Sequence, residues 1–329
     1  MAAHIDWHAR AHESWNDLTR VTGMRSPRGI RVHEPSRWRV VAAWPLSQVL
    51  HAAVLVDAAG IAGGRLGADS VWRSFRRYRR GDGFLDMPLI GERYYDDNAW
   101  IGLACAQRAL YTSGDVAAPW LRRAEASLRF VSQGVRRDGG VLWKEGGDRL
   151  HACSTGSAGL LAAGVARADG RSRSLARAAG VFIDTELVNP DGLIADSIGP
   201  DGDVDPSEFT YNQGLAIQLR IERVLTAHAR ELADIFIREF AGDRFWTHAA
   251  CFNAILCRAL LRLDAVTESR TYESFVTDYA DRLWRDARDD RGLFSGAGRY
   301  DAGYVLDHSA ITGVLAALAL DPAQRRTLL

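Results

Sequence analysis

The chain has little lysine, little cysteine and no excess of either charge. Of its 329 residues only Lys144 is a lysine, and the 41 Lys and Arg residues balance 41 Asp and Glu residues to a formal net charge of +0. This balance gives no reason to expect nucleic acid or an acidic membrane surface as a partner, so a neutral substrate fits best. Four cysteines without C-x-x-C spacing predict buried free thiols rather than disulfides or a zinc site.

Long apolar runs are also missing. No stretch reaches the roughly 18 consecutive apolar residues of a membrane span, and the first residues lack the basic start and apolar core of a signal peptide. We therefore expect a cytoplasmic monomer without a membrane span.

Convincing alternating strands are scarce as well, and segments of helical period follow one another with short breaks rich in Gly, Pro or Asp. Every second segment is rich in Ala, Gly, Leu and Val, as expected of a helix buried on most sides, whereas the others carry charges on one face. This alternation predicts an all-α fold, an (α/α)6 barrel of six helical hairpins that forms one domain over residues 1–329. The expected helices are 5–20, 38–59, 69–80, 97–113, 117–135, 154–168, 172–187, 211–225, 227–240, 247–263, 271–287 and 308–319.

The inner helices of such a barrel all start at the same end, so their first turns should converge on one cleft. Aromatic and hydrogen-bonding residues recur in these turns, which favours a carbohydrate site. The turns are 38–44, 94–100, 151–157, 209–213, 246–253 and 307–309.

Two adjacent carboxylates, Asp96 and Asp97, lie between aromatic residues where one inner helix begins. Asp is a common N-cap and first-turn residue, so the pair could simply cap the helix and complement its dipole. Neighbouring carboxyl groups can also lie about 5 Å apart, the separation that a retaining glycosidase requires. Capping needs no aromatic neighbours, whereas a sugar site uses them. A metal motif would want another carboxylate one turn on, where Trp100 and Ile101 stand instead.

Other polar segments have simpler interpretations. His4, His8 and His12 share one helix face, but no carboxylate partner completes a metal site, and an exposed helix face is favoured. The segment 201–205 begins like a calcium loop but lacks the closing Glu, so it is interpreted as an acidic turn. We therefore expect no metal.

The run Tyr94 to Ala104, YYDDNAWIGLA, resembles the signature of glycoside hydrolase family 76, the endo-α-1,6-mannanases. Residues 209–214 look like the family's Tyr-Asn-Gln-Gly element, and residues 140–144 look like its Gly-rich tryptophan segment. The resemblance implies an (α/α)6 barrel and no cofactor. It also implies retaining hydrolysis of α-1,6-mannosidic linkages, with an oligosaccharide or polysaccharide of the α-mannan type as substrate. Two segments depart from the family pattern, 252–254 and 151–155, and they put the subsite contacts in doubt.

On that pattern Asp96 would be the nucleophile and Asp97 the general acid/base. The residues expected to hold the sugar are Tyr95, Asn98, Trp100, Trp143, Tyr211, Asn212 and Gln213. Two alternatives remain open at this point. One is a non-catalytic mannan-binding protein on the same barrel, and the other is a cytoplasmic transglycosylase.

Overall fold

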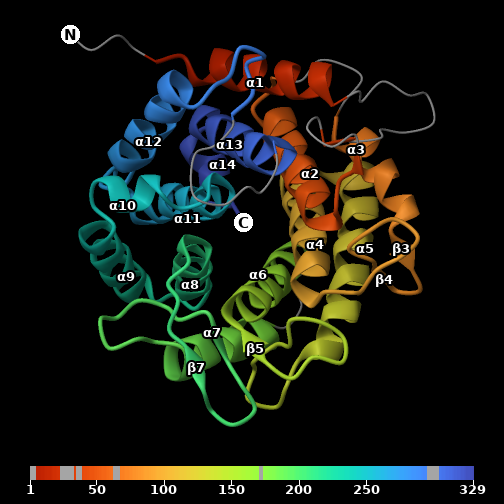
Figure 1. Cartoon of the computed structure of the whole chain (residues 1–329), viewed down its shortest axis with the longest axis vertical. Helices are drawn as coiled ribbons and strands as arrows, with labels where there is room; N and C mark the ends of the chain where they lie inside the picture. The colour runs from red at the N-terminus through yellow and green to blue at the C-terminus, as the bar shows by residue number, and fades with distance from the viewer. Residues whose placement is uncertain (1–4, 23–32, 35–38, 62–66, 170–172, 295–303) are drawn as a thin grey trace.

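Six inner helices form a closed ring in the computed structural model, which describes residues 5–22, 33–34, 39–61, 67–169, 173–294 and 304–329 (Figure 1). Around this ring α2 packs on α4, α4 on α6, α6 on α8, α8 on α11, α11 on α13, and α13 again on α2. The outer helices α1, α3, α5, α7, α9 and α12 each cover one member of the ring. The predicted all-α fold and (α/α)6 barrel are therefore confirmed.

The inner helices are α2 (Ala43–Ala58), α4 (Tyr95–Leu110), α6 (Ala152–Asp169), α8 (Thr210–Glu222), α11 (Ala250–Thr267) and α13 (Tyr304–Ala319). The outer helices are α1 (Trp7–Val21), α3 (Ala68–Ser74), α5 (Gly114–Val131), α7 (Ser174–Glu186), α9 (Thr226–Glu239) and α12 (Glu273–Asp286). Two short helices, α10 (Asp243–Trp246) and α14 (Pro322–Arg325), and the 3-10 turns Phe75–Arg77 and Ser132–Gly134 complete the helical part. Two-residue strands pair in three small sheets: β1 (His33–Glu34) with β2 (Arg39–Val40), β3 (Arg79–Arg80) with β4 (Gly83–Phe84), and β5 (Leu150–His151) with β6 (Ser197–Ile198), which also pairs with β7 (Val204–Asp205).

The composition of each helix explains its place in the barrel. In α11 every side chain from Ala250 to Asp264 is buried, because the helix has neighbours on nearly all sides. In α12 the buried positions are Val276, Tyr279, Ala280 and Leu283. They form the narrow apolar stripe of a helix whose other face is exposed to solvent. Helix α8 lies close to α11 at Gly214, where an added Cβ would lie 2.8 Å from the Leu256 Cα atom.

The structure differs from the sequence prediction mainly at element ends. The helix expected over 38–59 begins at Ala43, because Arg39 and Val40 pair with β1 instead. The helix expected over 69–80 ends at Ser74 and continues as a 3-10 turn into β3. The two short helices and the strands are too short to produce a periodic signal. Among the described residues, no helix is both long and apolar enough to cross a bilayer.

Candidate functional site

The N-terminal ends of the inner helices surround a cavity of about 550 Å³. Its volume lies within the range of about 300–1,000 Å³ that is usual for ligand pockets. Five of the six predicted turns contribute side chains to it, and the sixth contributes only its neighbour Leu306. The main lining residues are Trp44, Asp86, Tyr94, Asp96, Asp97, Trp100, Trp143, His151, Cys153, Asp196, Phe209, Tyr211 and Phe252.

Helix α4 brings the two adjacent aspartates to the cavity. Tyr94 is its N-cap residue, in an extended conformation, and no side chain caps the helix. Asp96 and Asp97 lie in the first turn, so neither side chain caps the helix, while both place negative charge near its N-terminus. The Tyr95 N–H donates to the Trp143 carbonyl oxygen at 2.7 Å, which fixes the start of the helix against the neighbouring loop.

The two oxygens of Asp96 have different surroundings. Oδ2 accepts hydrogen bonds from Trp143 Nε1 at 3.1 Å and from Cys153 Sγ at 3.6 Å. Oδ1 is buried and has no hydrogen-bond partner. Desolvation raises the pKa of Asp96, while the Asp97 backbone N–H, the indole, the thiol and His151 oppose that rise. These donors favour the ionised form of Asp96 within the pair.

Asp97 has no comparable set of donors. Desolvation raises its pKa well above the usual range, and the negative charges of Asp96 and Asp86 raise it further. Two carboxylates so close cannot both ionise at low cost, so the proton of the pair resides on the member with fewer stabilising donors. The geometry therefore provides one carboxylate and one carboxylic acid at the cavity.

Aromatic rings form two groups in the cavity wall. On one side the Trp143 ring packs against Tyr94, with centroids 5.0 Å apart, and against His151 at 5.3 Å. The Trp143 side chain is 42% exposed, which leaves part of its ring free to contact a ligand. On the other side Phe252 packs against Tyr211 at 4.4 Å and against Trp44 at 5.7 Å. Flat apolar faces beside polar groups suit a sugar ring.

A third acidic residue, Asp196, lies in the cavity wall and was missed by the sequence prediction. Its Oδ2 lies 3.4 Å from His151 Nδ1, and its Oδ1 accepts from Asn212 Nδ2 at 3.2 Å. The pairing of β5 with β6 sets His151 opposite Ser197, which brings Asp196 next to α6. Asp86 was missed for a similar reason, because it also lies in a loop where no periodic pattern marks it.

Four residues expected to hold the sugar do not line the cavity. Tyr95 is buried and stacks on Phe130. Asn98 bonds the backbone N–H and carbonyl of Phe84, and Gln213 bonds both backbone groups of Ile194. Asn212 reaches the cavity only through its bond to Asp196. These four side chains hold loops and wall residues in place.

Three other expected residues, Trp100, Trp143 and Tyr211, do line the cavity. Of the last predicted turn, Asp307 accepts from the Cys251 N–H at 3.1 Å, and His308 bonds to Ser14 and to the Phe294 N–H. Both belong to the packing of α13 rather than to the cavity lining.

The described residues contain no group of three metal-binding side chains. His4 lies outside them, while His12 bonds to Asn16 on its own helix. In the acidic turn, Asp203 pairs with Arg149 at 2.6 Å.

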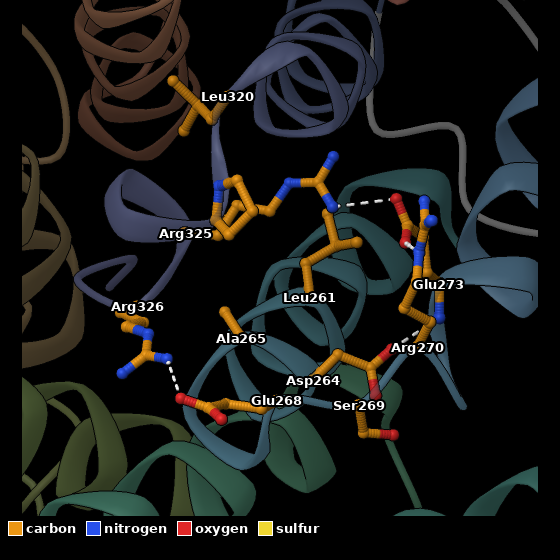
Figure 2. A pocket seen from close by; sticks show the side chains of 11 residues that line it. Leu261, Asp264, Ala265, Glu268, Ser269, Arg270, Glu273, Leu320, Arg325 and Arg326 are labelled. Carbon is orange, nitrogen blue, oxygen red and sulfur yellow. Dashed lines mark hydrogen bonds and ion pairs between the residues drawn. The ribbon is translucent and has the colours of Figure 1, made fainter.

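A second cavity, of about 450 Å³, lies at the opposite end of the inner helices, around the C-terminal part of α11 (Figure 2). Its arginines already have carboxylate partners. Arg325 and Arg270 both pair with Glu273, and Arg326 pairs with Glu268. The remaining acid, Asp264, accepts from the backbone N–H groups of Tyr272 and Glu273 through Oδ2, and its Oδ1 is buried without a partner among the described residues.

The model of glycosyl hydrolase family 76 matches residues 64–222, the part of the chain that contains the aspartate pair and most of its donors. This match extends over just under half of the chain, so residues 64–222 are similar to glycosyl hydrolase family 76. The match supports a glycoside hydrolase, as the resemblance implied. No curated protein sequence matches the chain.

Solved structures agree with the family 76 fold. A family 76 glycoside hydrolase from a bovine Bacteroides thetaiotaomicron strain has a TM-score of 0.82 at 20% identity, covering 96% of this chain and 78% of that one. A family 76 mannosidase from the same species has a TM-score of 0.80 at 20% identity, with 95% and 98% covered. An inactive variant of an α-1,6-mannanase from Salegentibacter sp., in which two adjacent aspartates are replaced by asparagine, is in complex with α-1,6-mannotriose. Its TM-score is 0.73 at 19% identity, with 95% and 99% covered.

Proposed function

We propose that this protein hydrolyses α-1,6-mannosidic linkages in mannan-type glycans with retention of configuration. The observation that carries the proposal is the adjacent pair of acids at the cavity, one held by an indole and a thiol and the other without donors. The Salegentibacter mannanase supports it, because its inactive variant lacks two adjacent aspartates and binds α-1,6-mannotriose.

In the proposed reaction Asp96 attacks the anomeric carbon and forms a covalent glycosyl-enzyme. Asp97 gives its proton to the glycosidic oxygen as the bond to the leaving sugar breaks. Asp97 then removes a proton from water, and the resulting attack on the anomeric carbon releases Asp96. The unpartnered Asp96 Oδ1 leaves the carboxylate less stabilised than a fully hydrogen-bonded one, which favours a nucleophile over a structural acid.

The substrate contacts follow from the cavity wall. Trp143, Tyr211 and Phe252 provide ring faces, while His151 and Asp196 offer hydrogen-bonding groups toward sugar hydroxyls. His151 and Phe252 lie in the two segments that depart from the family pattern. The preferred length and branching of the glycan should therefore depend on these two positions.

Incubation with α-1,6-mannobiose through α-1,6-mannotetraose, followed by mass analysis, tests the proposal. We expect shorter mannosides, and proton NMR of the first product should show the α-anomer. Asp97→Asn should lower kcat by about 10²- to 10⁴-fold, the usual contribution of a general acid. Asp96→Asn should abolish turnover. An aryl mannoside with a good leaving group departs without a proton from Asp97. On such a substrate, Asp97→Asn should therefore retain more activity than Asp96→Asn.

Asp115→Asn is the matched control, because Asp115 occupies the same second position of α5 that Asp96 occupies in α4 but is exposed. It should keep wild-type activity. Binding of mannotetraose without any product would contradict hydrolysis and favour a mannan-binding protein. Formation of alkyl mannosides in place of free sugar, with an acceptor alcohol present, would favour a transglycosylase.

A further inference from the structure

One buried charge in the barrel has no partner among the described residues. Arg258 lies midway along α11, its side chain is only 2% exposed, and its Nε atom is buried without a hydrogen-bond partner. No described carboxylate forms an ion pair with it. This contrasts with Arg325 and Arg326 at the far end of the barrel, each of which has a glutamate partner (Figure 2).

More unpartnered polar atoms lie on α2, the helix next to α13 in the ring. Both ring nitrogens of His51, Oε1 of Gln48 and Nε1 of Trp44 are buried without a partner. These positions are separated by four and three residues, so the three side chains share one face of the helix. A Cβ at Gly313 of α13 would lie 3.8 Å from Arg258 Nη1 and 4.0 Å from the Cα atom of Ala52, so the guanidinium reaches α2 beside His51. Burial lowers the pKa of His51, and the charge of Arg258 lowers it further.

Arg258 and the three α2 side chains, Trp44, Gln48 and His51, form a polar column. The column runs from the active-site cavity into the barrel. Trp44 and Ile255 line that cavity, and Gln48 and Arg258 follow them one helical turn deeper. Gly313 of α13 leaves room beside the guanidinium, because a Cβ there would lie 3.8 Å from the nearest Arg258 nitrogen, Nη1. The column therefore has a positive charge and room for about one methyl-sized group beside it, one helical turn below the cavity lining.

The chemistry of the column is that of an anion site. Arg258 Nε and Trp44 Nε1 can only donate hydrogen bonds, and a neutral His51 donates from one ring nitrogen. Gln48 donates from Nε2 to Ser47 Oγ at 3.4 Å, so its unpartnered Oε1 adds no donor to the column. Burying an unpaired charge is costly, and more than nine in ten buried polar groups have partners. Cys257 beside Arg258 does not supply the counter-charge, because desolvation raises the pKa of its thiol and keeps it protonated.

We propose that a small inorganic anion of the size of chloride binds between Arg258 and His51 beneath the active site. Bound there, the anion neutralises the guanidinium and accepts hydrogen bonds from the donors of α2 and α11. The site lies away from the aspartate pair, and Arg258 is not among the groups that shift the pKa of Asp96 or Asp97. The proposal thus concerns the stability of the barrel and does not depend on the substrate.

Bromide tests the site directly, because its anomalous scattering distinguishes it from water. Crystals of the wild-type protein grown or soaked in sodium bromide should show an anomalous peak within hydrogen-bond distance of the Arg258 guanidinium. The same result is expected with no sugar present. Absence of that peak would overturn the proposal and assign the column to water alone.

Thermal unfolding tests whether the anion is linked to folding. Sodium chloride should replace sodium methanesulfonate at constant ionic strength, and the wild-type Tm should rise by about 2 °C for each tenfold increase in chloride above its Kd. Arg258→Met should fold but lose this response, while the exposed Arg270→Met should keep it. Equal responses of the wild type and Arg258→Met would also overturn the proposal.

Discussion

At the scale of single residues, the site depends on two neighbours of identical chemistry that receive different surroundings. Asp96 has the Trp143 indole and the Cys153 thiol as donors, whereas Asp97 faces two further carboxylates. The sequence shows the pair and its aromatic neighbours, but Trp143 is 47 residues away from Asp96 and Cys153 is 57 away. Only folding brings these donors together, so the division of roles is a tertiary property.

Asp97→Asn should stabilise the protein while it removes activity. Because the folded-state pKa of Asp97 is raised, the folded protein holds a proton that the unfolded chain releases, and stability falls as pH rises from about 4 through the folded pKa. The variant removes this penalty. Its free energy of unfolding at pH 7 should exceed the wild-type value by about 1 kcal/mol or more, the worth of one pKa unit.

Urea unfolding at several pH values measures this effect. The difference between Asp97→Asn and the wild type should shrink as pH falls below about 4, the pKa of an unperturbed Asp, because the wild-type carboxyl then becomes protonated in the unfolded state as well. The exposed Asp115→Asn should change stability by less than about 0.5 kcal/mol. If Asp97→Asn were less stable than the wild type at pH 7, ionisation of Asp97 would not be the source of a stability cost.

The pH profile of kcat/KM should be bell-shaped, with both limbs above the usual Asp range. The acidic limb follows ionisation of the pair to one carboxylate, and the basic limb follows loss of the second proton, since both pKa values are raised. Trp143→Phe removes a donor that lowers the pKa of Asp96, so its acidic limb should move to higher pH. An unchanged acidic limb in that variant would show that the Trp143 indole does not lower the pKa of Asp96.

At the scale of elements, the periodic helices were predictable and the loops between them were not. Buried helices such as α11 and amphipathic ones such as α12 differ in composition along their whole length. Asp86 and Asp196 stand in irregular segments, where position depends on contacts with distant strands and helices. The predicted sugar contacts at Asn98 and Gln213 instead secure the loops at Phe84 and Ile194. An amide at a helix start suits either use, so sequence alone does not separate them.

Helix packing at Gly214 provides a test at this scale. A Cβ at Gly214 would meet the Leu256 backbone at 2.8 and 3.0 Å, and backbone atoms cannot rotate away. Gly214→Ala should therefore lower the free energy of unfolding by about 1–3 kcal/mol, the usual cost of overpacking. Gly313→Ala is the matched control in a helix interior, because its nearest contacts lie at 3.7 Å or more. In chloride-free buffer, where no anion would occupy the room beside Arg258, that variant should be neutral or gain up to about 1 kcal/mol of helix propensity.

At the scale of the whole molecule, the first helix of the chain packs on its last inner helix. Helix α1 packs against α13, with Trp15 and Leu18 buried, and Ser14 Oγ lies 2.6 Å from Thr312 Oγ1. Arg10 pairs with Asp281 at the edge of this contact. This contact joins segments nearly 300 residues apart in sequence, so the packing of α1 on α13 restrains both ends of the chain.

Deletion of residues 2–21 should therefore destabilise the barrel as a whole. Loss of two large buried side chains costs several kcal/mol, since removal of one large core side chain costs about 2–5 kcal/mol. Thermal unfolding followed by circular dichroism should show a lower Tm, with a single transition for the wild type. Deletion of residues 2–4, which leaves α1 whole, should leave Tm unchanged. An equal Tm for both deletions would show that α1 does not stabilise the barrel.

The sequence by itself determined the helical fold class, the alternation of inner and outer helices, and the acidic pair at the start of one inner helix. These features depend on local periodicity and on adjacent residues, which a linear pattern records. The tertiary structure decided which aspartate has donors, which aromatic rings line the cavity, and that Asp86 and Asp196 join it. Those outcomes depend on contacts between segments far apart in the chain, where the free energy of packing, rather than any local preference, sets the neighbours.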